Sequence, residues 1–265
     1  MLEYAHDYDQ KRVSKASDVF LAGEEVYFCG KRRVCLTARG RVKCLKCGRQ
    51  KSLKKLRKEL AILLAFVEQR PAYQVALEHG VSYPVVTRVF RSVRELLYHQ
   101  CELEGKRLSG DIEIDEAYFG GRRKGKKGRG AAGKSVVLGL LERQGQVYTR
   151  VVDTITAEQL MEVIRSKTRK GSVYYTDTFT SYNSLHQFGK HFKVNHDKTL
   201  VTKHHNHING IEGFWSYAKH KLYNYRGVSR ANFPVYLKEM EYRYNHRKEH
   251  ILDPLISLYF GYVSY

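Results

Sequence analysis

The chain has 265 residues, of which 42% are hydrophobic and 12% aromatic, so it can bury a core and is not a disordered polymer. Forty-seven Lys and Arg residues against 27 Asp and Glu residues give a formal net charge of +20, which favours a polyanionic partner such as nucleic acid. The sequence contains no apolar run near the roughly 18 residues of a membrane-spanning helix, and its first residues lack the apolar segment of a signal peptide. We therefore expect a cytoplasmic protein without a membrane partner.

Residues 1–51 form the first predicted region. Between residues 24 and 50, β-forming and basic residues alternate with turn glycines, which predicts short strands. Four cysteines are crowded into this segment, which indicates a metal site more than a secreted disulfide framework: Cys29, Cys35, Cys44 and Cys47. The last two have the C-x₂-C spacing of a zinc ribbon, but the first two are spaced C-x₅-C, so the pattern leaves open whether zinc is bound.

Residues 52–105 are predicted to be helical. Apolar residues recur at helical spacing from Ser52 to about Gln69, and two more helices are expected before residue 105. The offsets between Ala76, Gly80 and Val86 are typical of a helix-turn-helix, whose second helix would begin near Ser82. That helix would carry its basic residues toward a DNA groove: Arg88 and Arg91. A plain helical hairpin is the alternative interpretation.

Residues 106–265 change to an α/β pattern. Three β-rich runs come first, followed by a helix that Thr156 could cap, and then by alternating strands and helices. The expected strands are residues 111–119, 135–143, 146–154, 172–178 and 191–196, and the expected helices are residues 156–168, 182–188, 209–225 and 232–250. This order predicts an α/β domain with a mixed sheet.

Three acidic residues in this region fall on different predicted elements. Asp115 lies on the first strand, Asp177 ends a later strand, and Glu212 begins a helix. Phosphoryl transfer by divalent metal ions needs a few carboxylates that converge from separate elements, and hard cations such as Mg²⁺ prefer their oxygens. The pattern therefore makes these three residues candidate metal ligands.

Four segments carry a family resemblance in the expected order: "EIDEAYFGG", "YTDTFTSY", "HINGIEGFW" and "EYRYNHR". They resemble the DDE transposases of bacterial insertion sequences with an ISXO2-like catalytic domain, in the retroviral-integrase superfamily, over roughly residues 105–250. The resemblance implies a ribonuclease H-like fold whose catalytic residues are Asp115 on the first strand, Asp177 after the fourth, and Glu212 on a later helix.

The resemblance also implies the partners. Mg²⁺ or Mn²⁺ would be the cofactor, and double-stranded DNA, both the terminal inverted repeats of the element and its target, would be the substrate of cleavage and strand transfer. A homodimer or a larger synaptic assembly is expected because two ends must be paired. Such a protein would act in the bacterial cytoplasm, at the nucleoid.

Neighbouring residues admit more than one role. Strand alternation puts Glu113 on the same face as Asp115, as an acid beside the site, and Glu116 on the other face, as a bystander. Asn209 is predicted to cap the helix of Glu212, with a role in metal binding as the minor alternative. Trp215 is expected in the core.

Basic residues near the site are predicted to contact DNA. Lys219 lies two helical turns after Glu212, where the family has a phosphate-binding residue, although a solvated lysine is the alternative. Arg243 and Arg247 could face phosphate or flank a core-packing helix. The loop over residues 120–134 has no acid, and these members are expected to bind phosphate: Arg122, Arg123, Lys124, Lys126, Lys127 and Arg129.

Two other functions are compatible with the same residues. A decayed transposase could act as a DNA-binding regulator without catalysis. A ribonuclease H-like nuclease would hydrolyse DNA without joining strands. Metal-dependent cleavage separates the first from a transposase, and strand transfer separates the second.

Overall fold

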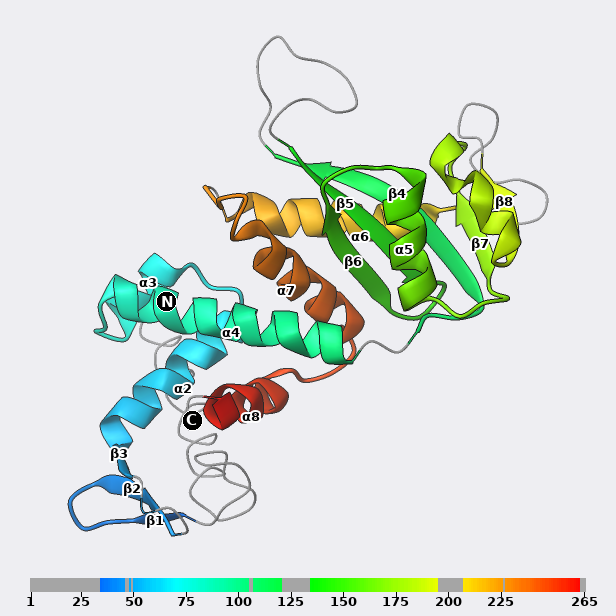
Figure 1. The fold of residues 1–265 in the computed structure, drawn as a ribbon. Coiled ribbons are helices and arrows are strands. Elements are labelled where there is room, and N and C mark those ends of the chain that lie inside the picture. Colours follow the sequence, from blue (N-terminus) through cyan, green and yellow to red (C-terminus); the bar gives the residue numbers. More distant parts are fainter. Residues whose placement is uncertain are drawn as a thin grey trace. The chain divides into compact units, whose positions relative to one another are not determined.

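A computed structural model describes residues 34–45, 48, 50–104, 107–120, 134–194, 207–225 and 227–262 (Figure 1). The chain divides into two compact units, one formed by residues 1–96 with 248–265 and the other by residues 97–247. This grouping joins the C-terminal residues to the N-terminal ones, which the predicted division into 1–51, 52–105 and 106–265 did not include. No helix among the described residues is long and apolar enough to cross a membrane.

The first unit begins with a small antiparallel sheet of β1 (Val34–Leu36), β2 (Arg41–Cys44) and β3 (Gln50–Ser52), in that order. Short strands were predicted here. Cys44 is a buried free thiol on β2. Cys29 and Cys47 lie outside the described residues, as does the side chain of Cys35, so the prediction of zinc binding has no support.

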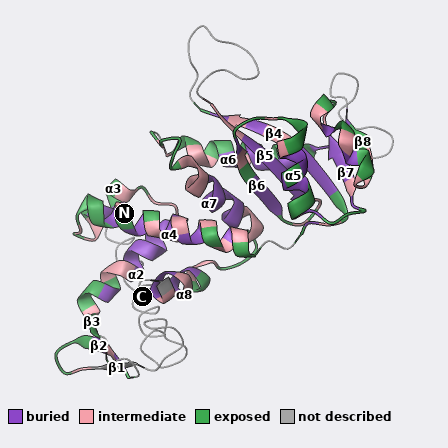
Figure 2. Cartoon of the chain, viewed as in Figure 1, coloured by how far each residue is buried: buried purple, intermediate pink, exposed green. Residues whose placement is uncertain are grey.

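The helices of the first unit are α2 (Leu53–Val67), α3 (Ala72–Glu78), α4 (Tyr83–Leu103) and α8 (Leu252–Tyr262), and the last residues of α4 belong to the second unit. Every residue of α2 from Leu60 to Phe66 is buried, so the second half of this helix is surrounded by protein (Figure 2). Part of that cover is α8, an apolar helix absent from the sequence prediction.

The turn between α3 and α4 has the geometry that its residues require. Ala76 and Val86 are buried, and Gly80 has a φ of +55°, which glycine adopts more easily than other residues. Arg88 is exposed on α4, and so is Arg91, whose Nε donates to Glu95 Oε1 at 2.8 Å. These features fit both a helix-turn-helix and the alternative of a plain helical hairpin, so the helix-turn-helix and DNA binding by the two helices stay predictions.

The second unit is built on a five-stranded mixed sheet in the order β6-β5-β4-β7-β8. Its strands are β4 (Asp111–Phe119), β5 (Ser135–Glu142), β6 (Val147–Val152), β7 (Val173–Thr176) and β8 (Lys190–Lys193). The pairs β4–β5 and β5–β6 are antiparallel, whereas β4–β7 and β7–β8 are parallel. This mixed sheet confirms the predicted α/β class.

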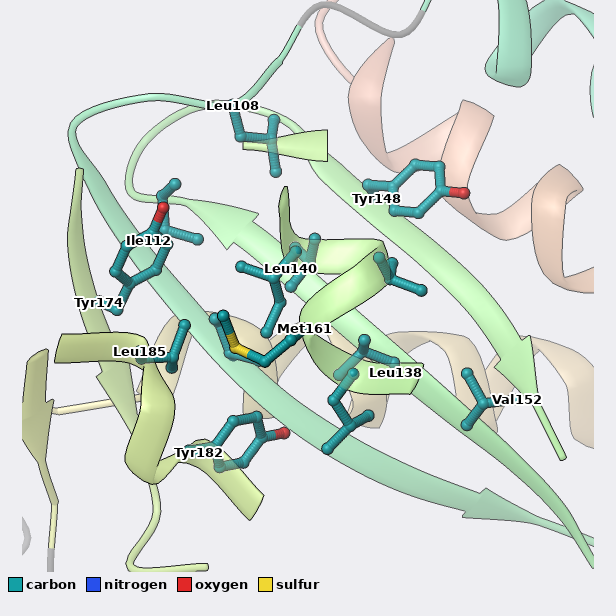
Figure 3. Close-up of a cluster of buried hydrophobic side chains, with 14 residues drawn as sticks. Leu108, Ile112, Leu138, Leu140, Tyr148, Val152, Met161, Tyr174, Tyr182 and Leu185 are labelled. Atoms are coloured by element: carbon teal, nitrogen blue, oxygen red, sulfur yellow. The ribbon is translucent and has the colours of Figure 1, made fainter. Parts of the chain in front are cut away.

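Helices cover both faces of that sheet (Figure 1). One face packs against α5 (Ala157–Lys167) and the 3₁₀ helix η1 (Thr180–Gln187), where apolar residues such as Ile112, Leu140 and Met161 form one core (Figure 3). The other face packs against α6 (Asn209–Tyr223) and α7 (Phe233–Asn245) in a second core. As predicted, Thr156 caps α5, because its side chain accepts a hydrogen bond from Gln159 N.

A buried ionic cluster ties α7 to the rest of this unit. Lys238 Nζ lies 2.9 Å from Glu102 Oε1 and 3.0 Å from Glu241 Oε1. Glu241 Oε2 in turn accepts from Thr149 N on β6 at 2.7 Å, and Lys167 on α5 pairs with Glu102 at 3.0 Å. The cluster places each buried charge beside an opposite one, which offsets the cost of desolvation.

Candidate active site

The two predicted aspartates lie where β4 and β7 run side by side. These strands pair in parallel up to Glu113 opposite Tyr175, and Asp115 and Asp177 each follow two residues later. Asp177 comes directly after β7, and its Oδ1 accepts a hydrogen bond from Phe179 N at 2.9 Å. Asp115 is therefore on the first strand of the sheet and Asp177 follows the fourth, as the resemblance implied.

Helix α6 brings the third carboxylate to the same region. Trp215 Nε1 on α6 donates to Asp115 Oδ2 at 3.1 Å, which fixes the helix against β4. Glu212 is exposed and lies one turn before Trp215, on the same side of the helix. Trp215 is buried in the core as predicted, but its hydrogen bond to Asp115 was not predicted.

Gly139 makes this contact possible. It is the residue opposite Asp115 in the β4–β5 pairing. A Cβ at this position would overlap the Trp215 ring and lie 2.9 Å from Ile211 Cδ1. Only glycine therefore lets the indole pack this closely on β5 and reach the Asp115 carboxylate.

The charges of Asp177 and Glu212 act on Asp115. Burial, together with the negative charges of Asp177 and Glu212, raises the pKa of Asp115 to about 6, against the opposing hydrogen bonds from the Glu116 backbone and the Trp215 indole. Such an all-oxygen, mutually repelling donor set suits a hard divalent cation, whose charge would offset the repulsion. In the described part of the chain, however, no three His, Cys, Asp or Glu side chains already stand close enough to hold an ion.

Glu113 anchors the beginning of α6. Its side chain is only 1% exposed, and its Oε2 accepts a hydrogen bond from Ile211 N, one residue before Glu212, at 2.9 Å. Its Oε1 accepts from Arg143 Nε at 3.0 Å and lies 3.3 Å from His207 Nδ1. A carboxylate at a helix N-terminus is stabilised by the exposed N–H groups and the helix dipole.

This arrangement corrects the prediction for Asn209. Asn209 is the first residue of α6, Ile208 occupies the cap position, and neither supplies a side-chain cap. The Glu113 carboxylate takes that role from the neighbouring strand. Gly210 leaves room for it, since a Cβ there would lie 2.8 Å from Glu113 Oε2. Helix capping from a distant strand has no local sequence signal.

Glu116 lies closer to the site than a bystander would. Strand alternation turns it to the η1 face, where burial and the charges of Asp115 and Asp177 raise its pKa to about 7, against the opposing effect of the Tyr182 hydroxyl. Among the described residues, neither Glu116 Oε1 nor Tyr182 OH has a hydrogen-bond partner of standard geometry. Tyr182 projects from η1 into the core of that face (Figure 3).

Sequence comparisons place the chain among transposases. The family model of the ISXO2-like transposase domain matches residues 107–245. The chain belongs to the ISXO2-like transposase family. An uncharacterized transposase-like protein of Haemophilus influenzae is 43% identical over 102 residues, which cover 38% of this chain and 81% of the relative.

Two solved structures of Mos1 transposase are also similar. The strand transfer complex is 15% identical, with a TM-score of 0.34 and 77% of each chain covered. The paired-end complex with the left transposon end is 12% identical, with a TM-score of 0.27, over 76% of this chain and 78% of that one. Because these values are low, the assignment to the DDE transposases of insertion sequences rests on the sequence matches.

The basic residues of this transposase have different surroundings. Lys219 is exposed on α6, with Nζ 5.8 Å from the Phe119 ring centroid, and Arg247 is exposed with its guanidinium 4.3 Å from the Tyr244 ring centroid. Arg243 is buried, and its Nε lies 2.9 Å from Glu239 Oε1, so the prediction that it faces phosphate is wrong and the core-packing alternative fits. The arginines and lysines predicted to bind phosphate between residues 122 and 129 lie outside the described residues.

Proposed function

We propose that this transposase binds the ends of its insertion sequence and catalyses Mg²⁺-dependent DNA strand cleavage and strand transfer. Asp115, Asp177 and Glu212 would hold the metal ion. The observation that supports the proposal is the position of Asp115 on β4 and of Asp177 at the end of the parallel strand β7, with α6, the helix of Glu212, bonded to Asp115 through Trp215. At the family level, polynucleotidyl transfer is the activity expected of a DDE transposase.

Bound Mg²⁺, or Mn²⁺ in its place, would activate the attacking oxygen and neutralise the charge of the transferred phosphate. The chain's own residues position the reacting groups. Trp215 holds the Asp115 carboxylate at one oxygen, and Glu113 fixes the turn of α6 that carries Glu212. Lys219, further along the same helix, would bind a DNA phosphate beside the carboxylates.

The proposed reaction has two steps, cleavage and strand transfer, and both use the same three carboxylates. Water first attacks a phosphodiester at the element end, which releases a strand with a 3′-hydroxyl. That hydroxyl then attacks a phosphodiester of the target DNA in line with its leaving oxygen. No covalent link between the protein and DNA is needed, because each step exchanges one phosphate oxygen for another.

The remaining parts of the chain fit a DNA-binding role. The net charge of +20 would attract both the terminal inverted repeats and the target duplex. The exposed Arg88 and Arg91 on α4 would contact the element ends. A homodimer or a larger assembly would pair the two ends for coordinated strand transfer.

The test is the Asp115→Asn variant. We expect it to bind element-end DNA as the wild type does and to lose Mg²⁺-dependent cleavage, because the amide removes the ligand charge without removing its shape. Asp153→Asn is the matched control, since this exposed aspartate lies just after β6 and outside the cluster. Cleavage of labelled element-end duplexes, followed on denaturing gels, gives the readout.

Each other outcome of the cleavage assay would point to a different site or function. Full cleavage by Asp115→Asn would sink the proposed site. Wild-type binding without any metal-dependent product would favour the inactive regulator. Cleavage of ends that never join to a target duplex would favour a ribonuclease H-like nuclease.

A further inference from the structure

A cavity of about 610 Å³ lies beside the candidate active site, and of the residues that line it the function proposed above uses only Lys219. It is bounded by the end of β4, the start of β5, the last turns of α6 and the segment that leads into α7. The residues that matter to its chemistry are three aromatic and two basic ones: Phe119, Tyr223, Phe233, Lys219 and Arg230. None of the described residues that line it is acidic.

We propose that this cavity binds one unpaired nucleotide of a DNA strand, with the base against the aromatic rings and a phosphate at Lys219 and Arg230. The proposal rests on the proposed function, since it assumes that DNA reaches Asp115. A nucleotide combines a flat π-face with an anionic group, and single-strand binding sites meet these needs with aromatic rings and cations. A paired base inside a duplex has no free face to offer.

The rings are arranged to receive a flat ligand. Phe119 and Phe233 lie 5.3 Å apart between centroids with an angle of 43° between their planes, and they form the floor, with Phe119 buried and Phe233 half-buried. Tyr223 is 67% exposed, so much of its ring is in contact with water. A base stacked on Tyr223 would remove this apolar surface from water.

The two cations come from separate segments. Lys219 Nζ lies 5.8 Å from the Phe119 ring centroid, so its charge borders the aromatic floor. Arg230 Nη2 donates to Lys134 O at 2.9 Å, which holds the guanidinium near the start of β5. Guanidinium has five N–H donors, so further donors of Arg230 remain for a phosphate.

The cavity is also at a suitable distance from the carboxylates. Tyr118 follows Asp115 by three residues of β4, a span of roughly 10 Å. Lys219 follows Glu212 by seven residues of α6, again a span of roughly 10 Å. At about 3.4 Å of rise per nucleotide, this separation equals some three steps along a strand.

A chain of contacts connects the cavity with Asp115. The Phe119 ring lies 5.9 Å from the Trp215 ring, and Trp215 donates a hydrogen bond to the Asp115 carboxylate. A nucleotide bound against Phe119 would therefore hold its strand beside the same side chain that orients Asp115.

The test measures binding without divalent metal, on the full chain with EDTA. The probes are a single strand of about twelve nucleotides that carries 2-aminopurine, and the blunt duplex of the same sequence. We expect the wild type to quench the fluorescent base in the single strand. Tyr223→Ala should weaken single-strand binding about tenfold and abolish quenching, and Tyr223→Phe should restore both, because stacking needs only the ring.

Lys219→Ala should weaken single-strand binding and lower its salt slope by about 0.7, the value for one phosphate contact. Phe192→Ala and Lys170→Ala are the controls, because they remove an exposed ring and an exposed charge from the same unit away from the cavity. Circular dichroism and thermal unfolding verify that each variant is folded. Duplex affinity should change less than threefold in Tyr223→Ala.

Two results would overturn the proposal. Equal losses for single strand and duplex in Tyr223→Ala would show general backbone contact without a nucleotide site. Unchanged affinity and quenching in that variant would show that the cavity takes no base. Quenching is measured without metal, whereas cleavage is measured with it, so a failure of the nucleotide site and a failure of the proposed active site are seen in different experiments.

Discussion

Trp215 and Gly139 show how single residues decide the geometry of this site. The indole reaches Asp115 only because the opposing position on β5 has no side chain. Trp215 looks like an ordinary core residue in the sequence, and Gly139 looks like a weak point in a strand. Their roles depend on a contact between residues that are 76 positions apart.

We predict that Gly139→Ala lowers the free energy of unfolding by about 1–3 kcal/mol, the usual cost of overpacking a core, and reduces cleavage because Asp115 loses its partner. Thermal unfolding and the cleavage assay measure the two effects. Gly213→Ala is the matched control: it lies within α6, and a Cβ there would meet nothing within 4 Å. A stable, fully active Gly139→Ala variant would contradict the assigned role of the Trp215–Asp115 contact.

Helix α6 is the element on which the site depends, and its first turn is held from outside. Glu113 accepts a hydrogen bond from Ile211 N, and Arg143 and His207 in turn contact the Glu113 carboxylate. Because the cap comes from β4, the position of Glu212 is linked to the strand that carries Asp115. Two of the three carboxylates are thus placed by one local network.

Glu113→Gln should lower the free energy of unfolding by on the order of 1–3 kcal/mol, the value of a buried hydrogen bond to a charged group. It should also raise the Mg²⁺ concentration needed for half-maximal cleavage, since Glu212 would no longer be held in place. Glu162→Gln, an exposed change on α5, is the control. A loss of stability with an unchanged metal dependence would limit Glu113 to a structural role.

The link between α7 and the sheet predicts a dependence on pH. Burial alone would raise the pKa of Glu102, but Lys238 and Lys167 outweigh it and lower the pKa to about 2. Since the ordinary value is 4.5, the stabilisation is present above pH 4.5 and is lost as the pH falls toward 2. Glu102 is 34% exposed, so we discount for solvent screening and expect about 1 kcal/mol at pH 7.

Glu102→Gln should therefore be less stable than the wild type at pH 7, and the difference should narrow between pH 4.5 and pH 2. Urea unfolding at a series of pH values measures it, again with Glu162→Gln as the control. If the difference in unfolding free energy between the two proteins stays constant across this pH range, the charge of the Glu102 carboxylate does not contribute to stability.

At the scale of the whole molecule, charge governs the encounter with DNA. With an excess of 20 positive charges, the chain should bind duplex DNA with an affinity that falls steeply with salt, by about 10³-fold or more between 50 and 200 mM for six phosphate contacts. Replacing the six Lys and Arg between residues 122 and 129 with Ser should reduce the salt slope by about 0.9 per lost contact. An unchanged slope would show that this segment does not contact phosphate.

The sequence alone predicted the order of the strands and helices of the second unit and its mixed sheet, and it named three carboxylates whose role as a site stays a prediction. These predictions depend on periodic patterns and short motifs, which are local and can be recognised in the sequence without a structure. The prediction for the first unit was less complete. It missed the apolar α8, which carries no such motif and packs on α2 although it lies at the far end of the chain.

Only the tertiary structure decided which neighbouring residues serve the site. Glu113 and Asn209 both had acceptable local roles, and the approach of β4 to α6 gave the cap to Glu113. Arg243 has a side chain that can bind phosphate, but α7 directs it inward to Glu239. Burial and partners at long range set these roles, and a linear pattern contains neither.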